Sequence, residues 1–132
     1  MSFTKLFELA KTARSFAYMP YSKFAVGAVL VTEDDETILG CNVENASYGL
    51  TNCAERTAIF KAVSEGKRQF KKLVVIGDTD GPISPCGACR QVISEFCDPN
   101  MPVILTNMKG DIQETTVAEL LPWAFTPMAL NK

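Results

Sequence analysis

Three cysteines in two short segments carry the chemistry that this sequence suggests first. Cys53 precedes one helical pattern, and Cys86 and Cys89 open another farther along the chain. Residues three positions apart share one face of a helix, so both thiols of the second segment emerge from its first turn. Unpaired backbone N–H groups and the helix dipole favour the thiolate form there. If the two helix starts meet, three thiolates converge, which matches three of the four corners of a tetrahedral zinc site.

The fourth zinc ligand decides what kind of site this is. The sequence has no histidine, which excludes Ser-His-Asp and Cys-His nucleophile systems and every zinc site that needs an imidazole. A closed structural site would need Cys41 or Cys97, but neither lies in a C-x-x-C pair. Three cysteines and a water molecule are therefore favoured, with one Zn²⁺ per chain. Cys41 and Cys97 are interpreted as small buried hydrophobic residues.

Three charged residues beside these cysteines have the chemistry that an open zinc site needs. Glu55 is the expected general acid and base, because its carboxylate lies two residues beyond Cys53 and can reach a zinc-bound water. Zn²⁺ with three thiolates has an excess of one negative charge, and Arg56 and Arg90 are expected to offset it through charge-assisted hydrogen bonds. The alternatives are a capping box, Asn52-x-x-Glu55, and two solvated arginines.

Length and composition predict a single domain over residues 1–132. A chain of 132 residues, 47% of them hydrophobic, buries enough surface to fold without disulfides. Its 13 Lys and Arg residues against 15 Asp and Glu residues give no basic excess, so a nucleic-acid polymer is not an expected partner. Charged residues interrupt residues 1–16, and we therefore expect no signal peptide, no membrane span and a cytoplasmic location.

Alternating helix and strand patterns predict an α/β fold. Helices are expected at residues 3–17, 52–65, 85–96 and 117–121. Strands are expected at residues 24–32, 37–43, 73–77, 102–106 and 112–115. The third helix is expected to have Ser84 as its N-cap and Pro85 as its first residue. A hairpin followed by helical crossovers implies a mixed five-stranded sheet with helices on both faces, a three-layer α/β/α sandwich.

The spacing of the zinc residues resembles a known enzyme signature. Cys53-Ala54-Glu55, followed after 30 residues by Cys86-Gly87-Ala88-Cys89, looks like the signature of zinc-dependent deaminases. In these enzymes a metal-bound hydroxide attacks the ring carbon that bears the amino group. Residues 17–28, 40–48 and 119–125 resemble segments of the small, homotetrameric bacterial cytidine deaminases. Together these segments extend the resemblance over nearly the whole chain.

The resemblance implies a cytidine deaminase-like fold and the activity of that family. The reaction would be hydrolysis of cytidine and 2′-deoxycytidine to uridine and 2′-deoxyuridine with release of ammonia, a step of pyrimidine salvage. Zinc-bound hydroxide would attack C4 of the pyrimidine, and Glu55 would shuttle the protons. The zinc ligands would be Cys53, Cys86 and Cys89. The protein would be a homotetramer.

The resemblance also implies which residues bind the nucleoside. Asn42 and Glu44 would contact the ribose hydroxyls. The other contacts would come from Phe24, Val43, Ala54 and, from a neighbouring subunit, Phe125. From the residues alone, Asn42 and Glu44 point to one side of a strand end, where a solvated pair is the plainer interpretation. A carboxylate beside the sugar would repel a 5′ phosphate, which favours a free nucleoside as the substrate.

Three alternatives stay open at this point. One keeps the chemistry and changes the substrate to a cytosine nucleoside antibiotic of the blasticidin S type. A dithiol oxidoreductase would use Cys86 and Cys89 as its redox pair and would leave Cys53 and Glu55 without a role. A structural zinc protein would need a fourth protein ligand. One residue departs from the family pattern, because Trp123 is bulkier than the small residue expected near Phe125.

Overall fold

A five-stranded mixed sheet lies at the centre of the computed structural model, which describes residues 1–130. The strand order is β2-β1-β3-β4-β5, and the bounds are β1 Val26–Thr32, β2 Thr37–Cys41, β3 Phe70–Gly77, β4 Pro102–Asn107 and β5 Ile112–Thr116. β1 is antiparallel to β2 and β3, and β5 is antiparallel to β4. β3 and β4 are parallel. A parallel pair needs a crossover connection, and helix α3 (Gly87–Phe96) supplies it.

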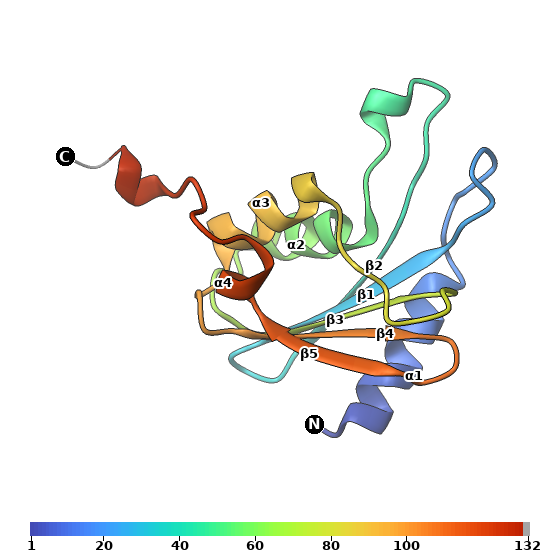
Figure 1. The fold of residues 1–132 in the computed structure, drawn as a ribbon, viewed down its shortest axis with the longest axis horizontal. Coiled ribbons are helices and arrows are strands. Elements are labelled where there is room, and N and C mark those ends of the chain that lie inside the picture. The colour runs from blue at the N-terminus through green and yellow to red at the C-terminus, as the bar shows by residue number, and fades with distance from the viewer. Residues whose placement is uncertain (131–132) are drawn as a thin grey trace.

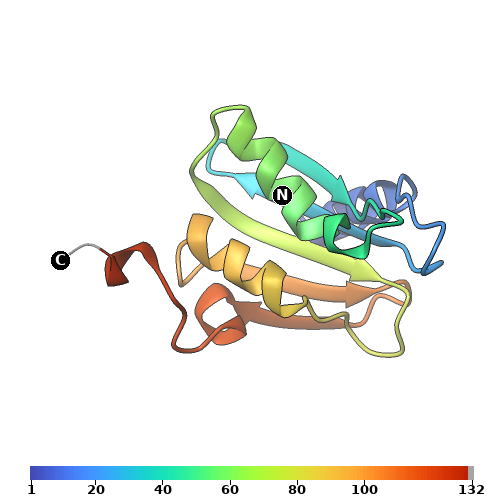
Figure 2. The same cartoon turned by 90° about the horizontal axis from the view of Figure 1, so that it is seen from above.

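Helices cover both faces of this sheet (Figures 1 and 2). α1 (Phe3–Arg14) packs on one face, and α2 (Ala54–Ser64) and α3 lie side by side on the other. α4 (Val117–Leu120) follows β5, and two 3₁₀ turns lie at Tyr48–Leu50 and Pro127–Ala129. The predicted three-layer α/β/α sandwich is confirmed. Within residues 1–130, no helix has both the length and the apolar character that a membrane span requires.

The central strand β3 fills two separate cores. Leu73 and Val75 belong to the core under α2 and α3, whereas Val74 and Ile76 belong to the core under α1. Successive side chains of a strand face opposite sides, so one apolar strand serves both layers. The chain leaves the carboxyl end of β3 and enters α3 through a short loop, which places the first turn of α3 at that end of the sheet.

Several helix boundaries differ from the predicted ones. The first helix ends at Arg14, and turns over residues 15–25 separate it from β1. The second helix begins at Ala54, because Cys53 has extended backbone angles and serves as the N-cap. Gly66 follows the C-cap of this helix with φ 87°, a left-handed conformation that glycine adopts without a steric penalty.

Gly40 lets α2 approach the sheet closely. It lies on β2 opposite Ala28 of β1. A Cβ at position 40 would stand 2.5 Å from the carbonyl oxygen of Ala54 and 2.5 Å from the amide nitrogen of Ala58. Both atoms belong to the helix backbone, so neither can move aside alone. The missing side chain therefore sets the distance between β2 and the helix start that carries Cys53.

We predict that Gly40→Ala lowers the free energy of unfolding by about 1–3 kcal/mol, because α2 must shift away from the sheet. Urea denaturation measures this change. Gly49→Ala is the matched control, since a Cβ at that position meets nothing within 4 Å. Equal stability of the two variants would contradict the packing described for α2.

Candidate functional site

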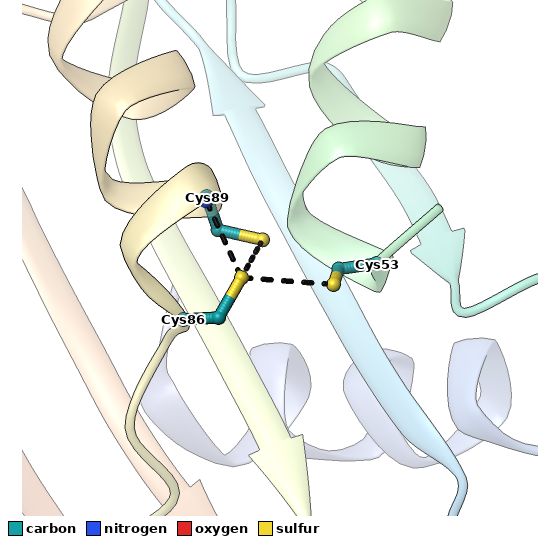
Figure 3. Close-up of side chains that lie close together, drawn as sticks. All are labelled: Cys53, Cys86 and Cys89. Carbon is teal, nitrogen blue, oxygen red and sulfur yellow. Dashed lines mark hydrogen bonds between the residues drawn. The ribbon is translucent and has the colours of Figure 1, made fainter. Parts of the chain in front are cut away.

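The first turns of α2 and α3 bring three cysteine sulfurs together (Figure 3). Cys53 is the N-cap of α2, Cys86 is the N-cap of α3, and Cys89 lies in the first turn of α3. The three Sγ atoms lie within 4.8 Å of one another. The Sγ atoms of Cys53 and Cys86 are 3.8 Å apart, and those of Cys86 and Cys89 are 3.3 Å apart. These are the thiols that the sequence predicted to converge.

The geometry and chemistry of these sulfurs fit a zinc ion. Tetrahedral Zn–S bonds of about 2.3 Å separate two sulfurs by about 3.8 Å, which matches the distance between Cys53 and Cys86. A set of thiol donors suits zinc and not the hard cations Mg²⁺ and Ca²⁺. Among residues 1–130, no fourth cysteine or carboxylate joins the group. The cluster therefore offers three ligands and leaves the fourth position to a molecule other than protein.

Cys86, and not Ser84, caps α3. The Cys86 sulfur accepts a hydrogen bond from the backbone N–H of Cys89 at 3.4 Å, and the helix begins at the next residue after Cys86. The prediction of Ser84 as N-cap and Pro85 as first helical residue is wrong, because the Ser84 hydroxyl accepts a hydrogen bond from Arg90 instead. The Cys86 sulfur therefore lies at the positive end of the α3 dipole.

Arg56 is the cation that contacts the cluster. Its Nη2 donates a hydrogen bond to the Cys53 sulfur at 3.2 Å. A hydrogen bond from the Cys89 thiol, aided by Arg56, lowers the pKa of Cys53 to about 5. The same hydrogen bond, together with burial, raises the pKa of Cys89 in the metal-free cluster. The Nε of Arg56 is buried and has no hydrogen-bond partner in the part of the chain that the structure describes.

Arg90 directs its hydrogen bonds away from the sulfurs. Its Nε donates to the carbonyl oxygen of Pro85 at 2.9 Å, its Nη1 to that of Leu120 at 2.8 Å, and its Nη2 to the Ser84 hydroxyl at 2.6 Å. The prediction that Arg90 offsets the thiolate charge through hydrogen bonds is wrong, because these three oxygen atoms orient the guanidinium group. Arg90 instead ties the turn before Cys86 to the end of α4.

Glu55 lies beside the cluster with its carboxyl group withdrawn from solvent. The residue is 3% exposed, and burial raises the pKa of its carboxyl group to about 7. A carboxyl group with a pKa near neutral pH can both accept and return a proton, as a general acid and base must. The capping-box alternative is wrong, because Cys53 is the N-cap and the Asn52 amide donates to the Thr57 hydroxyl.

Backbone hydrogen bonds connect the predicted substrate-binding residues to the thiol cluster. β2 ends two residues before Val43, the predicted end of this strand. Val43 instead forms bridges with both Tyr18 and Asn52. The N–H groups of Val43 and Asn52 each donate to the other residue's carbonyl oxygen at 2.9 Å. Since Asn52 directly precedes Cys53, residues 42–44 are fixed beside the first turn of α2.

Asn42 holds the backbone on either side of Ala25. Its amide donates to the Phe24 carbonyl and accepts from the Val26 N–H, each at 2.8 Å. Within residues 1–130, one N–H and one lone pair of this amide have no partner and can bind a ligand. The Phe24 ring lies at the end of β3, where a Cβ on Gly77 would stand 3.3 Å from its Cζ. Ala54, predicted to line the same site, is fully buried in the core under α2.

Glu44 lines a surface cavity of about 380 Å³. The remaining lining residues are Tyr21, Ser22, Tyr48 and Thr51. The carboxylate accepts hydrogen bonds from the backbone N–H groups of Tyr21 and Ser22, at 3.0 and 3.1 Å, and from the Ser22 hydroxyl. The hydrogen bond from the Ser22 hydroxyl lowers the pKa of the Glu44 carboxyl group. Sequence reasoning missed the contact with Ser22, although this residue lies in the segment 17–28 that carries the resemblance.

The C-terminal segment leads away from the thiol cluster of its own chain. After α4 the chain leaves the body and extends away from the first turns of α2 and α3 (Figures 1 and 2). Phe125 is 62% exposed and Trp123 is fully exposed. Trp123 has φ 58°, a left-handed conformation that is unfavourable for a bulky side chain. The Phe125 carbonyl oxygen accepts a hydrogen bond from Gln91 of α3, whereas its ring stays largely exposed.

The two other cysteines lie outside the cluster. Cys97 is 7% exposed, and burial raises its thiol pKa to about 12. Its interpretation as a buried hydrophobic residue is confirmed. Cys41 is only partly buried and lines a shallow groove beside Lys61, so the same interpretation is wrong for Cys41. Neither sulfur belongs to the three-thiol group, which disfavours a closed structural zinc site.

Comparison with known proteins gives consistent matches. Residues 2–105 match the sequence profile of the "Cytidine and deoxycytidylate deaminase zinc-binding region". The cytidine deaminase of Sporosarcina psychrophila is 64% identical over 131 residues, which cover 99% of this chain and 96% of the relative. The crystal structure of cytidine deaminase from Burkholderia pseudomallei matches with a TM-score of 0.93 and 57% identity, over 95% of this chain and 100% of that one. The blasticidin-S deaminase of Bacillus cereus is 34% identical over 129 residues, which cover 90% of this chain and 91% of that protein.

We predict that Arg56→Gln weakens zinc binding about tenfold, since residues that hydrogen bond to metal ligands typically contribute this much affinity. Competition with a chromophoric chelator measures the affinity. Arg68→Gln is the control, because Arg68 is exposed and donates to the Val63 carbonyl, away from the sulfurs. The account of Arg56 fails if both variants bind zinc as the unchanged protein does.

Glu55 should make the stability of the metal-free protein depend on pH. Its folded pKa of about 7 lies above the ordinary 4.5, so the folded state holds the proton more tightly than the unfolded state. The contribution of Glu55 to the free energy of unfolding should therefore fall by roughly 3 kcal/mol as the pH rises through this interval. Cys53, whose folded pKa is lowered to about 5, contributes a change of opposite sign.

Urea unfolding of chelator-treated protein at about pH 5 and about pH 8 measures the sum of these contributions. Glu55→Gln should remove the Glu55 part, because the amide does not ionise, so this variant should gain roughly 3 kcal/mol more than the unchanged protein between the two pH values. Glu95→Gln, at an exposed position on α3, should match the unchanged protein. The same pH dependence in Glu55→Gln as in the unchanged protein would contradict the assignment to Glu55.

Proposed function

Because this chain belongs to the cytidine and deoxycytidylate deaminase family, we propose that it hydrolyses cytidine and 2′-deoxycytidine. The products are uridine or 2′-deoxyuridine, and ammonia. The observation that carries this proposal is the convergence of Cys53, Cys86 and Cys89 beside the buried carboxyl group of Glu55. Three thiol donors and a nearby group that exchanges protons suit zinc-dependent hydrolytic deamination.

Glu55 carries the proton transfers in this proposal. Zinc, when bound by the three cysteines, supplies a nucleophile near neutral pH by lowering the pKa of water. Glu55 takes a proton from that water and delivers it to N3 of the pyrimidine, and it later transfers the second proton to the departing amino group. A pKa near 7 suits both directions of transfer. Arg56 offsets part of the negative charge of the thiolates through its hydrogen bond to Cys53.

The surroundings of Glu44 favour a free nucleoside as the substrate. The cavity of about 380 Å³ that Glu44 lines has the size of a small-molecule pocket. After its hydrogen bonds to residues 21 and 22, the carboxylate keeps a lone pair that can accept a ribose hydroxyl. A 5′ phosphate would be repelled by this charge. The other proposed contacts to the nucleoside come from Phe24, Asn42, Val43 and Ala54.

We also propose a homotetramer in which Phe125 of one subunit reaches the nucleoside bound by a neighbour. The support is the C-terminal segment, which leads away from its own cluster (Figure 1). This segment exposes four large apolar side chains, those of Trp123, Phe125, Met128 and Leu130. Apolar side chains gathered in this way mark surfaces that bind another protein.

We propose that this reaction is a step of pyrimidine salvage and takes place in the cytoplasm. A cytosine nucleoside antibiotic is less supported as the substrate, because identity to the cytidine deaminase of Sporosarcina psychrophila is 64%, against 34% to the blasticidin-S deaminase. A dithiol oxidoreductase is disfavoured as well, since the third thiol of Cys53 and the buried Glu55 have no part in it. The ratio of kcat/KM for cytidine and for blasticidin S distinguishes the two substrates.

The loss of cytidine absorbance on incubation with the protein, with and without a zinc chelator, tests substrate, reaction and metal together. Glu55→Ala should lower kcat at least about a hundredfold while zinc stays bound, because the carboxyl group moves protons and is not one of the three ligands. Glu95→Ala, at an exposed position on α3, is the control and should keep the activity. If Glu55→Ala were about as active as the control, Glu55 could not be the residue that transfers the protons.

A further inference from the structure

Two neighbouring side chains of helix α3 donate hydrogen bonds to the end of α4 and to the chain that follows it. Arg90 Nη1 donates to the carbonyl oxygen of Leu120 at 2.8 Å, and Gln91 Nε2 donates to that of Phe125 at 2.8 Å. The two acceptors mark the two ends of residues 120–125. Cys89 directly precedes Arg90 on this helix and Cys86 is its N-cap, so α3 connects the thiol cluster to this segment.

The backbone between the two anchors is held in an unfavourable conformation. Trp123 has φ 58° and a fully exposed side chain. A left-handed backbone at a bulky residue persists only where the surroundings impose it. An exposed indole cannot impose it through packing, and the hydrogen bonds at Leu120 and Phe125 constrain the chain on either side of this residue. The Phe125 ring, which is 62% exposed, likewise takes its position from the backbone and not from a core.

We propose that Gln91 is a positioning residue that fixes the direction of the Phe125 ring, with Arg90 anchoring the other end of the segment. This inference rests on the proposed function, in which Phe125 contacts the nucleoside of a neighbouring subunit. α3 then serves two sites: its first turn supplies two thiols to its own subunit, and its next residues orient the aromatic ring offered to the neighbour.

Gln91 tests this inference more cleanly than Arg90 does. Arg90 also donates to Ser84 and Pro85 in the turn before the thiols, so its replacement disturbs the metal ligands as well. The Gln91 amide makes its hydrogen bond to Phe125 alone among residues 1–130. Gln91→Leu removes the donor, and Gln91→Glu keeps the size of the side chain while it also loses the donor.

Fluorescence anisotropy of Trp123 measures the anchoring without any need for activity. Trp123 is the only tryptophan and lies between the two anchors. In the full-length zinc-loaded protein, both Gln91 variants should lower the anisotropy, because the segment moves more freely. Gln113→Leu is the matched control, since this exposed amide donates to the Glu114 carbonyl within β5. Anisotropy of the Gln91 variants equal to that of the control would overturn the proposal.

Kinetics then separate a positioning role from a general structural one. Gln91→Leu should raise KM for cytidine about tenfold with nearly constant kcat and zinc content, because the thiols and Glu55 are untouched. In combination with Phe125→Ala it should add nothing, since it acts through that ring. The proposal would be overturned if the increase in KM of the double variant equalled the product of the increases of the two single variants. An unchanged protein that does not deaminate cytidine would refute the proposed function instead, and the anisotropy alone would then decide the anchoring.

Discussion

Two helix N-termini meet at one point, and the rest of the site depends on this meeting. Each helix start presents unpaired N–H groups and the positive end of a dipole, so two of them side by side favour anions between them. Cys53 and Cys86 place sulfur there as N-cap residues. The thiolates repel one another in turn, and a cation at their centre removes that repulsion. Gly40 and the backbone hydrogen bonds of Val43 keep α2 where this balance requires it.

Because the chain has no histidine, Arg56 must compensate the charge of the thiolates and Glu55 must carry the proton transfers. A zinc site of three thiolates has more negative charge than one with imidazole ligands, and the Arg56 contact with Cys53 reduces this excess. Glu55 has no imidazole to share the proton transfers with, and its burial brings its pKa close to 7. Arg90 does not share the charge of the cluster. Its hydrogen bonds connect the metal-binding turn to the segment after α4.

The sequence predicted the features that depend on local pattern. The apolar strands, the helices and the Cys86-x-x-Cys89 pair are encoded within a few residues, so the sandwich followed from local pattern. The helix starts were displaced by about two residues, and the convergence of Cys53 with that pair depended on the two helix starts meeting. Orientations of long polar side chains were not predictable in this way. Arg90 is adjacent to Cys89 but bonds to Leu120, 30 positions away, and Ser22 bonds to Glu44, 22 positions away. Such contacts depend on how distant segments pack.

X-ray absorption at the zinc edge of the purified protein tests most directly the claim that this site is open and built on three cysteines. The account predicts three sulfur neighbours at about 2.3 Å and one lighter neighbour. Four sulfur neighbours would contradict it, because Cys41 or Cys97 would then close the site and Glu55 would have no water to act on.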